Sequence, residues 1–240
     1  MNNYDISVCD DENCEKGKFS SIDRSTNPFV SELKFDKPVR QIYLRNKVLD
    51  TAVQKSTRIY GMLLENDSAG VLYNMIGVNG AEYRHYNMSK YFLQQFTYLN
   101  ADLVIVSMGT NEAFYGGFDK DVFYRNIDTL VMGIRSINPN VAILLTTPGD
   151  SFRKSRKGRV KNPDVKLAKE TVIQYCMDHN LAYWDLYDVM GGYSSMAKWY
   201  SAKLAAKDRV HFSGKGYMIQ GDLFYRAFIE GYEKYKKSKN

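Results

Sequence analysis

The chain has 240 residues, of which 44% are hydrophobic and 25% are charged, and its formal net charge is +6. This length and composition are typical of a globular protein with one or two domains, and they exclude a disordered or fibrous chain. The longest apolar runs are far shorter than the roughly 20 residues that cross a bilayer, so we expect no membrane span, and no apolar leader opens the chain.

Cysteine and histidine do not form a pattern of metal ligands or of disulfide bonds. The cysteine count is odd, and only Cys9 and Cys14 lie near each other, in a polar N-terminal stretch. The histidines are far apart in sequence, so no cluster has the ligand spacing of a zinc site. We expect no bound metal, and a pairing of Cys9 with Cys14 stays open.

Positive charge is spread along the chain except in residues 153–159, where five of seven residues are basic. A basic surface of this kind can bind a polyanion. No nucleic-acid-binding motif accompanies the run, so we expect no nucleic-acid partner.

The N-terminal third predicts an incomplete β-structure. The first 27 residues are polar, lack periodicity and predict irregular structure. Residues 31–36 and 39–45 alternate polar and apolar side chains as half-buried antiparallel strands do, and residues 57–65 are a third candidate strand. Three or four strands cannot close a β-sandwich. We therefore expect a partial β-rich, jelly-roll-like region over residues 1–69.

The pattern changes at residue 70, where continuous apolar runs begin to alternate with helix-like segments. The predicted strands are residues 71–76, 102–108, 141–146 and 181–186, and the predicted helices are residues 81–99, 119–137, 164–179 and a last helix that Ser213 caps. Apolar strands that alternate with helices indicate a parallel sheet covered on both faces. We expect an α/β domain over residues 70–240.

Two loops that follow predicted strands carry groups that could stabilise an oxyanion. Ligands of such sheets bind at the carboxyl ends of the strands, where these loops lie. Gly80 lacks a Cβ, so its N–H can approach a ligand closely, and Asn111 offers a side-chain N–H donor. Each such donor lowers the barrier of acyl transfer by roughly 3 kcal/mol. The alternative is a glycine in a tight turn and an asparagine that caps a helix.

Asp208 and His211 have the spacing of a catalytic acid–histidine pair. A carboxylate three residues before an imidazole can accept its Nδ1–H and leave Nε2 free to take a proton from a nucleophile. A surface histidine that lies near an acid has the same spacing, so this pair alone does not distinguish the two.

Taken in order, these motifs resemble those of the SGNH (GDSL-type) hydrolase family. The glycine motif is Ile-Gly-Val-Asn-Gly-Ala at residues 76–81, the asparagine motif is Gly-Thr-Asn-Glu at residues 109–112, and the histidine motif is Asp-Arg-Val-His at residues 208–211. The resemblance covers about residues 70–235. It is strongest to two-domain bacterial members in which a β-sandwich interrupts the esterase domain.

The resemblance implies a flavodoxin-like, three-layer α/β/α fold. It also implies ester hydrolysis through an acyl-enzyme, often the deacetylation of a carbohydrate or peptidoglycan, with no cofactor. His211 would be the general base, Asp208 its orienting acid, and Gly80 and Asn111 the oxyanion donors. The partner would be a glycan or small-molecule ester, and a full-length parent protein would be secreted or periplasmic.

The nucleophile of this pattern is missing. In the family the serine lies in a Gly-Asp-Ser motif after the first strand, ahead of the glycine and asparagine motifs, and residues 1–76 contain no such motif. Gly149-Asp150-Ser151 follows a later strand, so we interpret Ser151 as a residue that lines the site or caps its loop. The nucleophile is left unassigned.

The strand that precedes the Gly-Asp-Ser motif would be missing as well. In a flavodoxin-like sheet this first strand is interior, so its absence leaves unpaired backbone groups on the neighbouring strands. Three explanations are open. The chain could belong to a longer protein that has an upstream strand and Gly-Asp-Ser motif, which we favour. A partner chain or a second copy could complete the sheet. The domain could also be a non-catalytic, carbohydrate-binding relic.

Overall fold

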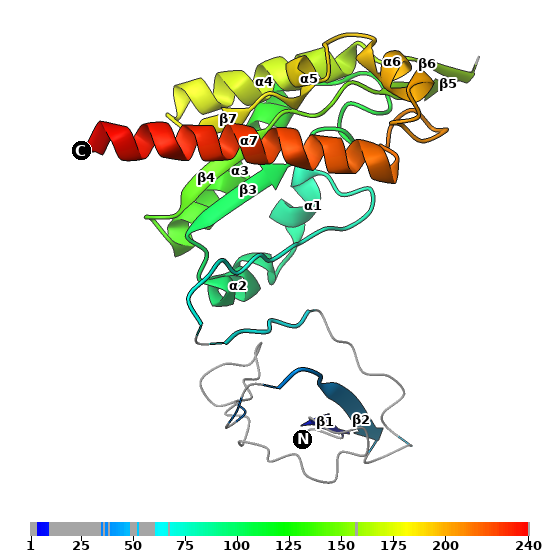
Figure 1. The fold of residues 1–240 in the computed structure, drawn as a ribbon. Helices are drawn as coiled ribbons and strands as arrows, with labels where there is room; N and C mark the ends of the chain where they lie inside the picture. The colour runs from blue at the N-terminus through cyan, green and yellow to red at the C-terminus, as the bar shows by residue number, and fades with distance from the viewer. Residues whose placement is uncertain are drawn as a thin grey trace. The chain divides into compact units, whose positions relative to one another are not determined.

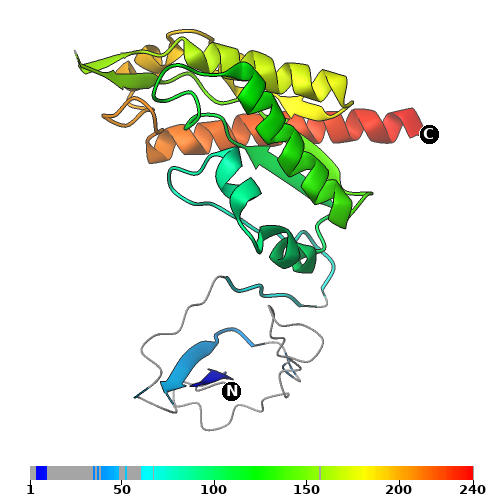
Figure 2. The same cartoon turned by 180° about the vertical axis from the view of Figure 1, so that it is seen from behind.

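The structure is a computed structural model, and it describes residues 4–9, 35, 37, 39–48, 52, 61–66, 68–156 and 158–239. Contacts within the chain define two units, residues 1–76 with 94–99 and residues 77–93 with 100–240. Figures 1 and 2 show the chain from opposite sides. The domain boundary expected after residue 69 stays a prediction.

The first unit contains one antiparallel pair of strands among its described residues, β1 (Tyr4–Cys9) and β2 (Tyr43–Val48). The expectation of irregular structure at the N-terminus is wrong for β1, in which Tyr, Ile and Val alternate with polar residues as in a half-buried strand. β2 overlaps the strand expected at residues 39–45. The candidates at residues 31–36 and 57–65 lie partly outside the described residues, and their described residues are not in a strand.

The expectation of a buried strand at residues 71–76 is wrong. These residues have no regular secondary structure, and their large apolar side chains, among them Val71, Tyr73 and Met75, are exposed. A buried parallel strand needs hydrogen-bonded neighbours for its backbone groups. No strand in the described part of the chain pairs with this run. The local sequence pattern is that of a buried strand, but a strand also needs a neighbouring strand for its backbone hydrogen bonds, and the pattern does not show whether one is present.

The second unit is built around a three-stranded parallel sheet. Its order is β3 (Leu103–Ser107), β4 (Ala142–Thr146) and β7 (Ala182–Trp184), with Leu103 opposite Ala142. All three lie where apolar runs predicted strands, so the parallel sheet is confirmed. Among the described residues β3 pairs with β4 alone, which places β3 at the edge of the sheet.

Helices cover both faces of this sheet, as the two opposite views show (Figures 1 and 2). α3 (Lys120–Ile137) and α4 (Asp164–Asp178) pack against each other on one face, and α7 (Gly214–Lys239) crosses the other. N-capping side chains determine where two of these helices begin. Asp119 accepts two N–H groups of the first turn of α3, and Ser213 Oγ accepts one from the first turn of α7. The α/β/α arrangement is confirmed.

One predicted helix is broken into three pieces. Residues 81–99 form α1 (Tyr83–Met88), α2 (Phe92–Phe96) and the short 3-10 helix η1 (Thr97–Leu99). Ser89 has extended backbone and ends α1, because serine readily leaves a helix to bond locally. None of the helices in the described part of the chain is both long and apolar enough to cross a bilayer.

The two faces of the sheet are unequally covered. Val106 and Leu145 are buried on one face. On the other face Trp184 packs edge-on against Phe224 of α7, with 5.1 Å between ring centroids. Ile105, in the edge strand β3, is 39% exposed on that same face. The sheet therefore has both a free edge and a poorly covered face at β3, as far as the described residues show.

Two short helices and a hairpin were not predicted. The helices are α5 (Leu186–Val189) and α6 (Ser195–Ser201), and the hairpin consists of β5 (Phe152–Ser155) and β6 (Gly158–Lys161). Helices of 4 and 7 residues are too short to show a periodic apolar pattern. The hairpin is basic and lacks the apolar alternation that usually indicates strands.

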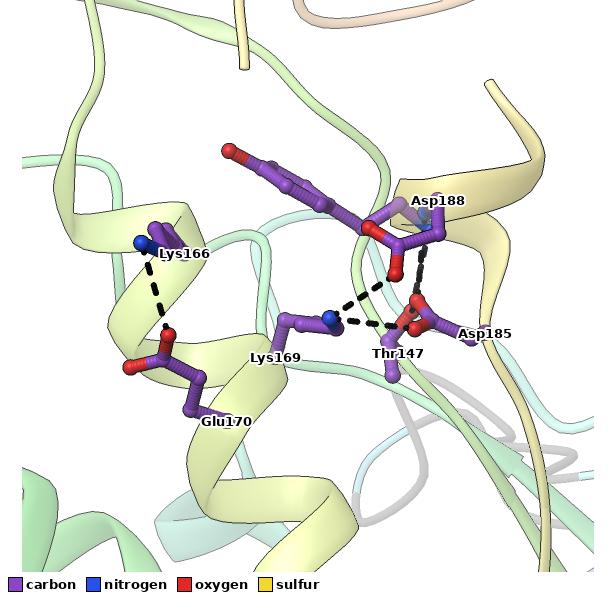
Figure 3. A network of polar contacts seen from close by, with 7 residues as sticks. Thr147, Lys166, Lys169, Glu170, Asp185 and Asp188 are labelled. Carbon is purple, nitrogen blue, oxygen red and sulfur yellow. Dashed lines mark hydrogen bonds and ion pairs between the residues drawn. The ribbon is translucent and has the colours of Figure 1, made fainter. Parts of the chain in front are cut away.

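A polar network ties the segment after β4 to the segment after β7 (Figure 3). Thr147 Oγ1 donates to Asp185 Oδ1 at 2.9 Å and accepts the N–H of Tyr187 at 3.1 Å. Lys169 of α4 lies 3.3 Å from Asp185 and 3.0 Å from Asp188. These contacts fix the carboxyl ends of two strands, which is where ligands of such sheets bind.

Candidate active site

Asp208 and His211 form a hydrogen-bonded pair on the turn that leads into α7. The Nδ1 of His211 lies 2.7 Å from Oδ2 of Asp208, and Asp208 Oδ1 accepts the N–H groups of Val210 and His211 at 2.9 and 3.0 Å. An ionised carboxylate can only accept, so Nδ1 carries the proton. Nε2 then keeps a lone pair and has no partner among the described residues. This geometry is the one that the spacing predicts.

The same bonds keep Asp208 ionised. Partial burial acts to raise its pKa, but the hydrogen bonds from the His211 ring and from two backbone N–H groups outweigh burial and leave the pKa below its ordinary value. The His211 side chain is 59% exposed, so a ligand can reach Nε2. A charged carboxylate behind an accessible imidazole is suited to proton transfer.

Arg209 fastens this turn to the loop after β4. Its backbone is left-handed, with φ of 54°, and its carbonyl accepts the N–H of Phe152 at 2.8 Å. Its guanidinium lies over the rings of Phe152 and Tyr200, 5.0 and 4.7 Å from their centroids. Sequence reasoning did not single out Arg209, and its place between the aspartate and the histidine was the only signal for it.

The loops of Gly80 and Asn111 are joined to each other. Asn111 Nδ2 donates to Ala81 O at 2.7 Å, and Glu112 Oε1 accepts the N–H of Tyr83 at 2.7 Å. Asn111 keeps a second N–H for a ligand. Gly80 has φ of 75°, and no atom lies within 4 Å of where a Cβ would be, so the position calls for glycine because of its backbone angle rather than for lack of space.

Hydrogen bonds connect the loops at the carboxyl ends of the strands. Asn162, which follows β6, donates from Nδ2 to Ala113 O at 2.8 Å and from its backbone N to Ser151 O at 3.2 Å. Ala113 belongs to the loop that carries Asn111, and Ser151 precedes Phe152, which is bonded to the histidine turn. The donor loops and the acid–histidine pair therefore lie on one connected set of loops at one end of the sheet.

Ser151 is buried and is not presented to a ligand. It is 1% exposed, and its Oγ has no hydrogen-bond partner among the described residues. Asp150 accepts the N–H of Met196 at 2.9 Å and so caps α6, while burial raises the pKa of the Asp150 carboxyl. A serine nucleophile needs a base within hydrogen-bond reach, and Ser151 has none in the described part of the chain.

The site offers two kinds of chemistry. Nε2 of His211 can accept a proton, and Asn111 together with the backbone near Gly80 can donate hydrogen bonds to an oxyanion. Acyl transfer needs both. In the described part of the chain, no three His, Cys, Asp or Glu side chains are grouped as they would be around a metal ion.

Glu112 was also missed by sequence reasoning, and it makes stability depend on pH. Burial raises its pKa, and the hydrogen bond from the Tyr83 N–H only partly opposes this. Between the ordinary pKa of about 4.3 and the higher folded value, the native state keeps a proton that the unfolded state has released. The free energy of unfolding therefore falls as pH rises through this window.

We expect Glu112→Gln to make this decline smaller, because glutamine cannot ionise but can still accept the Tyr83 N–H. The measurement is urea unfolding from pH 4 to pH 8. Glu170→Gln, at an exposed position of α4, is the matched control and should leave the decline unchanged. An equal decline in wild type and Glu112→Gln would contradict the role of Glu112. A residual decline is expected from Asp150, whose raised pKa acts in the same direction.

Comparison with known proteins gives one family match. The GDSL-like lipase/acylhydrolase family matches residues 48–219. No match is found among curated proteins.

Several solved structures are similar to this chain. A peptidoglycan O-acetylesterase is 27% identical with a TM-score of 0.58, and the match covers 63% of this chain and 44% of that chain. A lipase/acylhydrolase from Enterococcus faecalis is 23% identical with a TM-score of 0.45, covering 62% and 70% of the two chains. An acetylxylan esterase from Geobacillus stearothermophilus is 21% identical with a TM-score of 0.47, covering 61% and 67%. The chain thus spans less than half the length of the O-acetylesterase.

Proposed function

Because the chain belongs to the GDSL-like lipase/acylhydrolase family, we propose that it is a serine ester hydrolase of the SGNH type in which Asp208 and His211 provide the base. The observation that carries the proposal is the 2.7 Å bond between the His211 Nδ1 and the Asp208 carboxylate. It fixes the tautomer that leaves Nε2 basic, and the imidazole is accessible.

The proposed reaction has two halves that use the same groups. Nε2 of His211 takes the proton of a serine hydroxyl as its oxygen attacks the ester carbonyl, and the oxyanion accepts hydrogen bonds from Gly80 N and Asn111 Nδ2. The imidazolium then gives its proton to the departing alcohol, which leaves an acyl-enzyme. Water then attacks the acyl carbonyl with Nε2 of His211 again as base, and the imidazolium returns the proton to the serine oxygen as the acyl–serine bond breaks and the acid leaves.

The nucleophilic serine comes from a strand and Gly-Asp-Ser segment outside residues 1–240, which pairs with the free edge of β3. Two observations support this placement. β3 pairs on one side only among the described residues, and Ile105 beside that edge is 39% exposed. A strand parallel to β3 would end next to the Gly80 and Asn111 loops, because the carboxyl ends of parallel strands meet at one end of the sheet.

The same edge also supports a second candidate, in which another polypeptide supplies the strand. The two candidates differ in whether the strand with the Gly-Asp-Ser motif and this chain are encoded by one gene or by two. For a segment of the same polypeptide, a purified full-length parent would be active as a monomer. For a partner chain, activity would depend on the concentration of the second polypeptide.

The proposed substrate is an acetyl ester of a carbohydrate or of peptidoglycan. The likeness to a peptidoglycan O-acetylesterase at 27% identity supports this choice, although the chain spans 44% of that protein. The test uses the chain fused to an upstream strand that ends in Gly-Asp-Ser, called here the completed chain. We expect it to release acetate from O-acetylated peptidoglycan and to hydrolyse p-nitrophenyl acetate faster than p-nitrophenyl palmitate. A folded completed chain that binds acetylated glycan without releasing acetate would instead indicate a carbohydrate-binding relic.

A further inference from the structure

The β5–β6 hairpin concentrates positive charge on one face. In its register Lys154 lies opposite Arg159, and Lys161 lies two positions further along the same strand and on the same face as Arg159. Side chains that face each other across an antiparallel pair are close, and like charges there destabilise the hairpin. The fold therefore keeps an arrangement that weakens it locally.

Among the described residues no carboxylate forms an ion pair with Lys154 or Arg159, while on the same face Lys161 interacts electrostatically with the Asp150 carboxylate. Arg153, on the opposite face, pairs with Asp164 at 3.0 Å. Lys154, Arg156 and Arg159 are exposed and form no ion pair with any described residue. Two exposed cations that face each other without a carboxylate between them are available to bind a negatively charged ligand.

The base of the hairpin is attached to the turn that carries His211. Phe152, the first residue of β5, donates its N–H to Arg209 O at 2.8 Å, and the Arg209 guanidinium stacks on the Phe152 ring. Both views show the hairpin projecting from the end of the unit opposite the C-terminal end of α7 (Figures 1 and 2). A long ligand that lies along the cationic face would therefore lead toward the candidate site.

We propose that Lys154 and Arg159 bind the acidic groups of an anionic polysaccharide, so that the substrate class is a charged glycan polymer. The proposal rests on the proposed function for the identity of the ligand as a glycan. The hairpin cations lie outside the set of groups that carry out ester chemistry. They therefore contact a different unit of the same polymer from the one whose ester is hydrolysed. An uncharged glycan would gain nothing from this face.

The test measures binding without turnover, using the chain as it exists. The probes are polygalacturonate and the same polymer fully methyl-esterified, which has the same backbone without the charge. We expect the chain to bind only the acidic polymer. Lys154→Gln/Arg159→Gln should raise Kd about tenfold or more at low salt, since each cation near an anionic surface contributes an attraction that salt screens. Far-UV circular dichroism should show an unchanged fold, because the substitutions remove a repulsion.

The matched control is Arg226→Gln/Lys237→Gln, which removes one arginine and one lysine from exposed positions of α7. We expect it to change Kd less than about twofold. An equal loss in both double variants would show a general effect of net charge and would overturn the proposal. The proposal would also be overturned if the chain bound poly(U) RNA more tightly than polygalacturonate and the Lys154→Gln/Arg159→Gln variant lost that binding. Hairpin-dependent glycan binding by a completed chain that releases no acetate would support this proposal while contradicting the proposed function.

Discussion

Replacing His211 by alanine in the completed chain is expected to lower kcat by about 10⁴-fold or more. The substitution removes the group that takes the serine proton and later protonates the leaving alcohol, so both halves of the reaction lose their base. KM should change little, because the imidazole acts on the reacting atoms and not on the rest of the substrate. The measurement is steady-state hydrolysis of p-nitrophenyl acetate.

The matched control is His179→Ala. His179 ends α4 and lies beside Tyr124 and Tyr175, away from the loops of the candidate site. We expect that variant to keep kcat within about twofold. Similar kcat values for wild type and His211→Ala would show that another base does the work.

The second large effect is expected for Asn111→Ala in the completed chain. Loss of one oxyanion donor lowers kcat by about 10²–10³-fold while KM stays close to its original value. The Asn111 side chain also donates to Ala81 O at 2.7 Å, so we expect an additional loss of stability of about 1 kcal/mol. Kinetics at substrate saturation and urea unfolding measure the two effects separately.

Asn138→Ala separates the structural effect from the catalytic one. The Asn138 side chain also donates to a backbone carbonyl, that of Ala101, at 3.2 Å, but it lies at the other end of α3 from the loops of the site. We expect this variant to lose stability without a large change in kcat. Equal losses of kcat in the two variants would mean that Asn111 acts only through the fold.

The elements that the sequence predicted well are those that are determined by residues close together in the sequence. β3 and β4 are continuous apolar runs, and α3 begins at Asp119, which caps it without help from distant residues. The Asp208–His211 pair is equally local, because both partners lie on one short turn and their geometry depends on few other contacts. Patterns over a few residues are enough for such features.

The elements that sequence missed depend on distant partners. The apolar run at residues 71–76 has the pattern of a buried strand but no described neighbour. The bond from Asn111 to Ala81 joins residues thirty positions apart, and spacing cannot predict such a bond. The turn of Arg209 is fixed by Phe152 and Tyr200, from two other elements. In each case the local sequence identifies one residue of a tertiary contact but does not identify its partner, which is distant in the sequence.

In the proposed enzyme this chain provides the base and the oxyanion donors, and the nucleophile is supplied from outside residues 1–240. Labelling with a serine-reactive fluorophosphonate, followed by peptide mapping, tests this division on the 240-residue chain and on its His211→Ala variant. We predict no label on either, because Ser151 is buried and has no base within reach. Label on Ser151 that disappears in His211→Ala would contradict this division and would show that the chain carries a complete, rearranged catalytic site.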